Sequence, residues 1–251
     1  MEEIEWQKLR ADQLREMAER NAIVIVPIGA LEQHGPHLPA GVDSILGETI
    51  ALRTARLVAE REPVVVLPCI WSGISENHMS LGGTITLDFE AFFGLMRCVV
   101  SSLARQGFRR IVLLNSHGGN NDALRICCDE LSTRFNLPLV RMTYWHAAPD
   151  AIARNLETQA GLFHACEAET SMMMALRPEL VAEDRIPSSD GRTSPGIRDV
   201  VGAGVYLWQS SKNRSPTGVI GNPAAATKEK GQRLLEEIPQ ELAAKIAARE
   251  L

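Results

Sequence analysis

The chain has 251 residues, of which 45% are hydrophobic, a length and composition typical of one globular domain with a large core. Its 26 basic and 31 acidic residues give a net charge of −5, with both signs mixed along the chain. This balance argues against nucleic acid or an anionic membrane as the main partner. We predict a single domain over residues 1–251.

The N-terminal segment, MEEIEWQKLR, is acidic and polar, without the basic start and apolar stretch of a signal peptide. No segment has the uninterrupted apolar length that a membrane-spanning helix needs. The five cysteines lie in apolar surroundings without CxxC spacing, which is typical of reduced thiols. These features predict a cytoplasmic protein without a membrane partner.

Short runs rich in Val and Ile alternate with longer segments of helical periodicity. The runs predict strands at residues 22–29, 64–68, 110–115 and 137–144. Apolar stripes predict helices at residues 43–60, 88–106 and 124–135, within 163–176, and near 235–246. Alternating strands and helices are the signature of an α/β fold, in which helices cover both faces of a parallel sheet.

Residues 186–222 differ from the rest of the chain, because they are rich in Pro, Ser, Gly and Asn. We predict an elaborated loop or hairpin region there, with a strand pair near VVGAGVYLWQ. The basic side chains of this region have two possible roles. They could recognise hydroxyls or an anion, or they could form a solvated oligomer surface. They are Arg192, Arg198, Lys212 and Arg214.

Side chains that hold metals or move protons follow the first and third predicted strands. Glu32, His34 and Asp43 come after the first strand, and His117 comes after the third. Ligands of open parallel sheets bind beyond the carboxyl ends of the strands. We therefore expect these four side chains to meet at one edge of the sheet and to form a site.

A third group of such side chains lies in FHACEAETSMMMAL, where His164, Glu167 and Glu169 begin a predicted helix. Glutamate near a helix N-terminus is also explained by the helix dipole alone. Joined to the first group, these residues would complete a site for two divalent ions. Mixed imidazole and carboxylate ligands suit Zn²⁺ or Mn²⁺, with iron as an alternative. Paired ions activate a bridging water and polarise a carbonyl, and a neighbouring histidine can carry the proton.

Three segments in this order, EQHGPHLPAGVD, NSHGGN and HACEAETS, resemble the creatininase family of metal-dependent hydrolases. The match runs from about residue 20 to residue 176, with SLGGTITL between the motifs and a looser similarity in GVIGNPAAATKEKG. The resemblance implies a three-layer α/β/α sandwich with a mostly parallel central sheet. It also implies a homo-oligomer, with a hexamer as the expected form.

The resemblance implies which residues hold the metals. Glu32, Asp43 and His117 would hold one ion. His34, Asp43 and a further carboxylate would hold the second, so that Asp43 bridges the two ions.

The remaining polar residues of the motifs are expected to act on the substrate side. His164 would be the acid/base group that protonates the leaving amine, and Glu169 would orient His164 or support the metal shell. His37, in the first motif, and His78, in a Gly/Ser-rich loop, are expected to contact the substrate, as is Gly118. A structural role for His37 is an equal alternative.

The chain departs from the enzymes that act on creatinine directly after His117. Those enzymes carry Tyr and a metal-binding Glu where this chain has Gly118 and Gly119. Glu167 stands at a position where creatininase has an apolar residue, and we expect this extra carboxylate to replace the lost ligand. The family branches with this glycine motif resemble formamide deformylases, a peptide-processing enzyme of redox-cofactor maturation and hydrolases of keto-inositols. Phe163 stands where a creatinine-binding tryptophan is expected, so creatinine is not the expected substrate.

The leading hypothesis is a dinuclear metal hydrolase that cleaves a C–N bond in a small amide, cyclic amide or formamide. The alternative keeps the same metals and opens a cyclic ketone or lactone of a sugar or cyclitol. A cysteine hydrolase using Cys166 and His164 is disfavoured, because catalytic partners normally come from separate elements. A non-enzymatic binding protein would tolerate Glu32→Gln, whereas a metal hydrolase would lose a metal and turnover. No phosphate-binding glycine motif supports nucleotide binding.

Overall fold

The computed structural model describes residues 2–187 and 207–248. Within them, four strands form a parallel sheet in the order β2-β1-β3-β4. Their bounds are β1 (Ile23–Ile28), β2 (Val64–Val66), β3 (Arg110–Asn115) and β4 (Leu139–Thr143). All four lie where the Val- and Ile-rich runs predict them. Because β1 pairs with β3 along its whole length, the carboxyl ends of these two strands lie side by side.

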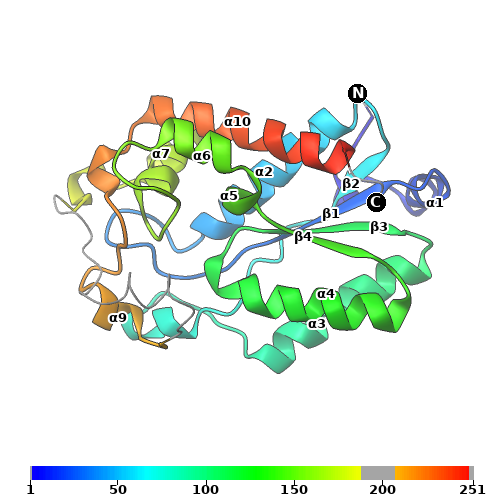
Figure 1. Cartoon of the computed structure of the whole chain (residues 1–251), viewed down its shortest axis with the longest axis horizontal. Helices are drawn as coiled ribbons and strands as arrows, with labels where there is room; N and C mark the ends of the chain where they lie inside the picture. Colours follow the sequence, from blue (N-terminus) through cyan, green and yellow to red (C-terminus); the bar gives the residue numbers. More distant parts are fainter. Residues whose placement is uncertain (1, 188–206, 249–251) are drawn as a thin grey trace.

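Helices cover both faces of the sheet (Figure 1). One layer contains α2 (Val42–Val58), α5 (Tyr144–Ala147), α6 (Pro149–Asn155), α7 (Glu167–Leu176) and α10 (Lys228–Ala247). The opposite layer contains α3 (Phe89–Arg105) and α4 (Asn121–Phe135). Two further helices are α1 (Ala11–Glu19) and α9 (Ser211–Arg214). The 3₁₀ turns are η1 (Trp6–Lys8), η2 (Glu76–Leu81), η3 (Gly118–Asn120), η4 (Pro178–Leu180), η5 (Glu183–Arg185) and η6 (Pro223–Ala225).

The sheet is buried on both faces, as parallel sheets require. Every residue of β1 is buried, and its side chains alternate between two hydrophobic cores. Ile23 and Ile25 pack toward α2 and α10, whereas Val24 and Val26 pack toward α3 and α4. The α/β/α sandwich is therefore confirmed.

The termini of the predicted helices agree with the structure to within a few residues, except that α10 begins at Lys228, before the predicted residue 235. Asp88 caps α3 as its position suggests, because its Oδ1 accepts a hydrogen bond of 2.7 Å from the backbone N–H of Ala91. The sequence prediction missed α1 and α6, which are short and bury few residues. The predicted strand pair near VVGAGVYLWQ falls mainly on residues 188–206, outside the described part of the chain. No helix within the described ranges is long and apolar enough to cross a membrane.

Helices α7 and α10 pack at close range, and this contact positions the third motif. A Cβ atom on Gly231 of α10 would overlap the backbone carbonyl of Ser171 in α7. Only glycine allows this approach. The HACEAETS segment is thereby held between α10 and the carboxyl edge of the sheet.

Candidate active site

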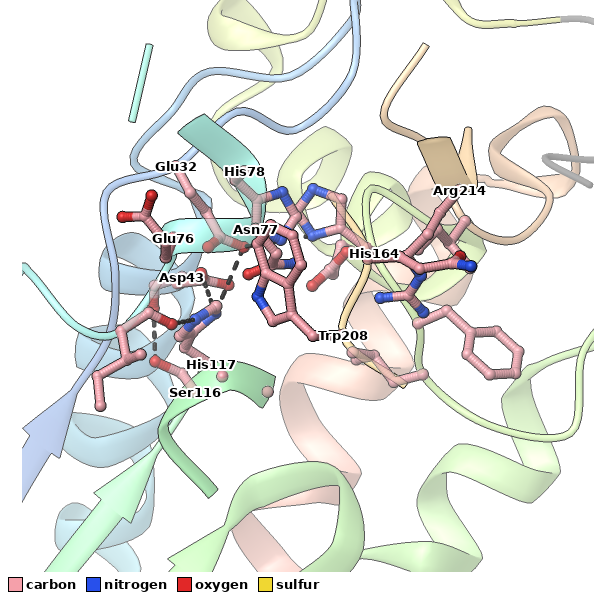
Figure 2. A pocket seen from close by; sticks show the side chains of 18 of the residues that line it. Glu32, Asp43, Glu76, Asn77, His78, Ser116, His117, His164, Trp208 and Arg214 are labelled. Carbon is pink, nitrogen blue, oxygen red and sulfur yellow. Dashed lines mark hydrogen bonds and ion pairs between the residues drawn. The ribbon is translucent and has the colours of Figure 1, made fainter. Parts of the chain in front are cut away.

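The carboxyl ends of β1 and β3 bring the first four site residues together. Glu32 and His34 lie in the loop after β1, and Asp43 lies in the first turn of α2. His117 is the second residue after the end of β3. Figure 2 shows Glu32, Asp43 and His117 turned toward one another. All four residues are buried, with at most 4% of their surface exposed.

Glu32 lies at the centre of a ring of histidines. Its Oε1 is 3.3–3.4 Å from one ring nitrogen of each of three residues, namely His117, His78 and His164. His78 comes from η2, and His164 comes from the loop before α7, where it pairs through its backbone with Ile220. Four segments that are far apart in the sequence therefore converge on one carboxylate.

Asp43 lies between two groups of potential metal ligands. Its Oδ2 is 3.2 Å from His117 Nδ1, in the group formed with Glu32. Its Oδ1 is 3.5 Å from His34 Nε2, in the group formed with Glu169. Glu169 Oε1 lies 3.9 Å from the same His34 nitrogen. The shared carboxylate has the position that a bridging ligand would need.

The hydrogen bonds of two histidines direct a lone pair into this cluster. His117 Nε2 lies 2.9 Å from the carbonyl oxygen of Ile74, so Nε2 carries the proton and Nδ1 faces the carboxylates. His34 Nδ1 lies 3.1 Å from the carbonyl oxygen of Glu32, which leaves its Nε2 facing Asp43. A backbone carbonyl that holds the outer ring nitrogen is the usual arrangement of a metal-binding histidine.

The unpaired atoms of the cluster fit a divalent cation. His34 Nε2, Glu32 Oε2 and Asp43 Oδ2 are all buried, and none has a hydrogen-bond partner among residues 2–187 and 207–248. Buried polar atoms are costly unless something binds them. Ligands that share a tetrahedral ion at about 2.1 Å lie about 3.4 Å from one another. The separations of 3.2–3.5 Å between these nitrogen and oxygen atoms match that spacing.

The pKa shifts show that the cluster needs positive charge. Burial lowers the pKa of His34, but the charges of Asp43 and its neighbours outweigh this effect and raise it to about 9. The pKa of His117 is also raised, because Glu32 and Asp43 outweigh burial. Burial raises the pKa of Glu169 to about 7, against the positive charge of His34. Protons thus compensate the carboxylates where no metal is bound, and metal binding would displace them.

His164 is held neutral beside the cluster. Its ring lies between those of His34 and His78, with centroid distances of 4.2 and 4.3 Å. Burial, and then the charges of these two histidines, lower its pKa well below the ordinary value. Its Nε2 lies 2.7 Å from the carbonyl oxygen of Gln33 and therefore carries the proton. The lone pair on Nδ1 faces Glu32, so His164 can accept a proton there.

Glu167 does not join the cluster, contrary to the sequence-based expectation. Its carboxylate is buried on the other side of α7, where it lies 2.8 Å from Lys230 Nζ and accepts hydrogen bonds from Thr158. Glu169 approaches His34 instead. Side chains two positions apart on an α-helix are rotated by about 200° about the helix axis, so they lie on nearly opposite faces. Only one of these glutamates can therefore face the site.

Of the residues expected to contact the substrate, some line a pocket and one does not. His78 and Gly118 line a pocket above the cluster. His37 is buried outside the lining of this pocket, where its Nε2 lies 2.9 Å from Thr170 Oγ1. Burial lowers its pKa to about 4, so it is neutral. The alternative structural role of His37 is therefore the one that its position supports.

Cys166 is buried, and burial raises its pKa to about 12. A catalytic cysteine needs a lowered pKa and access to the substrate. The cysteine hydrolase alternative is therefore not supported.

Sequence reasoning missed Gln33, which holds two of the histidines. Its Oε1 accepts a hydrogen bond of 2.9 Å from the backbone N–H of Gly35, so its Nε2 donates to His78 Nδ1 at 2.7 Å. The hydroxyl of Ser211 also lies 3.0 Å from His78 Nδ1. His78 therefore carries its proton on Nε2, toward Glu32. No local signal marks Gln33, because its partner lies 45 positions away in the chain.

The two glycines after His117 have different surroundings, and this difference can be tested. A Cβ atom on Gly119 would overlap the carbonyl oxygen of Ile74, which fixes the His117 ring, whereas one on Gly118 would meet nothing within 4 Å. We expect Gly119→Ala to weaken metal affinity about 10–100-fold, as the loss of a ligand's supporting hydrogen bond does. Gly118→Ala is the matched control and should keep the wild-type affinity. Competition with a chelator of known affinity measures both, and equal affinities for the two variants would contradict this reasoning.

The fold and the buried cluster define a metal-dependent hydrolase. Comparison with known proteins agrees: the Creatininase model, described as creatinine amidohydrolase, matches residues 7–246. The chain belongs to the creatininase family.

Three relatives show the range of the family. Creatinine amidohydrolase of Pseudomonas putida is 30% identical over 96% of this chain and 93% of that protein. Mycofactocin precursor peptide peptidase of Mycobacterium ulcerans is 31% identical, with coverage of 89% and 84%. 3-dehydro-scyllo-inosose hydrolase of Thermotoga maritima is 28% identical, with coverage of 93% and 79%.

Solved structures agree with the fold and with metal binding. The crystal structure of creatinine amidohydrolase superposes with a TM-score of 0.85 at 26% identity, over 98% of both chains. A manganese form of creatininase superposes with a TM-score of 0.84 at 26% identity, again over 98% of both chains. This chain is a family member with a divalent-metal site, distinct from creatininase itself.

Proposed function

We propose that this protein is a dinuclear metal hydrolase that cleaves the C–N bond of a small amide, cyclic amide or formamide. The observation that carries the proposal is the pair of ligand groups that share Asp43. Glu32, Asp43 and His117 would hold one ion. His34, Asp43 and Glu169 would hold the other. Zn²⁺ and Mn²⁺ are the ions that this donor set suits best, with iron as an alternative.

Two bound ions would supply a water that is deprotonated near neutral pH and would polarise the carbonyl under attack. The residues of the chain handle the proton. His164 Nδ1 faces Glu32 and can accept the proton of the attacking water, because its Nε2 proton is fixed on the carbonyl of Gln33. The same nitrogen can then deliver this proton to the leaving nitrogen. Glu32 contacts both His78 and His164 and thereby keeps these two rings in place.

A second candidate is hydrolysis of a cyclic ketone of a cyclitol, by analogy with the inosose hydrolase relative. The polar lining residues Glu76, Asn77 and Gln209 favour it, since they can bind hydroxyls. Both candidates use the same metal ligands. The homo-oligomeric state, the cytoplasmic location and the single-domain organisation stay predictions of the sequence.

Metal removal tests the proposal. Protein purified without a chelator or a metal-binding tag should contain about two divalent ions per chain. Dialysis against a chelator should abolish hydrolysis of N-formyl amines and small amides, and Zn²⁺ or Mn²⁺ should restore it, because the ions would lower the pKa of the attacking water and polarise the carbonyl. Elemental analysis and a product-amine assay measure the two effects. Protein that binds no stoichiometric metal after reconstitution would overturn the proposed mechanism.

A further inference from the structure

We propose that the substrate of this enzyme carries an aromatic ring, which packs against Phe163 and Trp208 at the mouth of the metal site. The inference rests on the proposed function and names the substrate class more narrowly. It arises from the part of the pocket that the metal ligands do not use.

The pocket is much larger than the reacting group. Its volume is about 430 Å³, within the usual range for small-molecule sites. Figure 2 shows Glu32, Asp43 and His117 together on one side of the pocket, away from Arg214. A formyl or acetyl group bound at that end would leave most of the cavity unfilled, so a further part of the substrate must contact the remaining walls.

Those walls are largely apolar and accessible. Phe163, Leu207 and Trp208 are 43%, 59% and 55% exposed, and all three line the pocket. Phe163 comes from the loop before α7, and Leu207 and Trp208 come from the segment before α9. Trp145 and Leu162 extend the same lining. Large apolar side chains that gather around a binding site are typical of a surface that a ligand covers.

Two of these residues favour a flat ring over a flexible alkyl chain. Phenyl and indole side chains stabilise aromatic partners by stacked or edge-to-face contacts, in addition to the area they bury. Phe163 and Trp208 supply both kinds of ring within one cavity. An aromatic substituent on the scissile amide would use both surfaces.

Some of the polar groups of the lining are already engaged within the protein. The amide nitrogen of Asn77 already donates to the hydroxyl of Ser211, and that hydroxyl also contacts His78. Gln209 Oε1 is buried and has no hydrogen-bond partner within the described part of the chain. Hydroxyls that are buried against Phe163 and Trp208 would lose their hydrogen bonds to water. At the Phe163 and Trp208 walls an aromatic amide therefore fits better than a cyclitol, whereas Glu76 and Arg214 supply charged groups elsewhere in the lining.

Metal-chelating hydroxamates test the inference by equilibrium binding, which requires no turnover. Isothermal titration of the metal-loaded protein would compare acetohydroxamic, phenylacetohydroxamic and gluconohydroxamic acids. We expect the phenyl compound to bind at least about tenfold tighter than the acetyl compound, through the aromatic contacts. Trp208→Ala should remove most of that preference, and Phe163→Ala should reduce it. Trp71→Ala is the matched control, since Trp71 is 54% exposed and lies outside the pocket lining.

Each outcome decides between the possibilities. If the acetyl and phenyl compounds bind equally well, the proposal of an aromatic subsite is wrong, whereas the proposed metal site is unaffected. If the glucono compound binds most tightly, the subsite is wrong and the cyclitol candidate gains support. If Trp71→Ala lowers the preference as much as Trp208→Ala does, the proposed location is wrong. Failure of all three compounds to bind would overturn the proposed metal function, and this inference with it.

Discussion

Glutamine in place of Glu169 is expected to lower the metal content from about two ions per chain to about one, and to reduce kcat/KM at least about 10³-fold. The carboxylate of Glu169 is the third member of the group formed with His34 and Asp43. An amide is a much weaker ligand for a divalent ion than a carboxylate of the same shape. The group at Glu32 and His117 does not include Glu169 and should keep its ion.

Glu167→Gln is the matched control, because it makes the same chemical change two positions away. The Glu167 carboxylate faces Lys230 and Thr158, so this variant should retain both metal ions when it is measured below its unfolding temperature. Elemental analysis after gel filtration gives the metal content of each variant. Loss of an ion from Glu167→Gln, with none lost from Glu169→Gln, would support the original sequence-based assignment and contradict the structure.

The second large effect concerns stability. Glu167→Gln should lower the free energy of unfolding by about 3–5 kcal/mol, because it leaves the Lys230 ammonium buried without its carboxylate partner. Glu167 is fully buried and Lys230 is 4% exposed, so solvent cannot replace the lost interaction. The other nearby carboxylate, Glu157, lies 3.2 Å from Lys230 Nζ but is largely exposed. Urea unfolding, followed by circular dichroism at a fixed metal concentration, measures the change.

A double-mutant cycle separates the ion pair from the local packing. Lys230→Met should also be destabilising, because it leaves the Glu167 carboxylate without its cation. The double variant should lose less stability than the sum of the two single variants, since neither charge is then stranded. Simple additivity of the two losses would show that Glu167 and Lys230 are not coupled.

The fold was largely predictable, because its dominant signals are local. A parallel sheet buried on both faces requires continuous apolar strands, such as AIVIV, which cannot be mistaken for an amphipathic helix. Helices such as α3 repeat apolar residues at helical spacing and carry a capping residue, Asp88. The short helices α1 and α6 bury too few residues for periodicity to reveal them.

The first part of the site was predictable for a related reason. Neighbouring parallel strands end at the same edge of the sheet, so polar residues placed directly after them must meet. This rule brings Glu32 and His34 to His117 without any knowledge of side-chain packing. The family resemblance then implies which residues would hold the first metal, and the structure brings those residues within reach of one another.

The orientation of the HACEAETS motif could not be predicted from the sequence. Glu167 and Glu169 lie two residues apart on α7, so their side chains point in nearly opposite directions. The chain order does not specify how a helix is rotated about its axis. The contact of α7 with Gly231 and Lys230 of α10 sets this rotation, and it turns Glu169 toward His34.

The sequence by itself thus determined the strand and helix pattern, the family and the edge of the sheet where metal ligands gather, because these depend on local periodicity and chain order. The tertiary structure alone decided that Glu169, and not Glu167, faces His34, and that His37 lies outside the pocket. It also decided that Phe163 and Trp208 line one pocket with the cluster. These outcomes depend on packing between residues far apart in the chain, and no local pattern records such contacts.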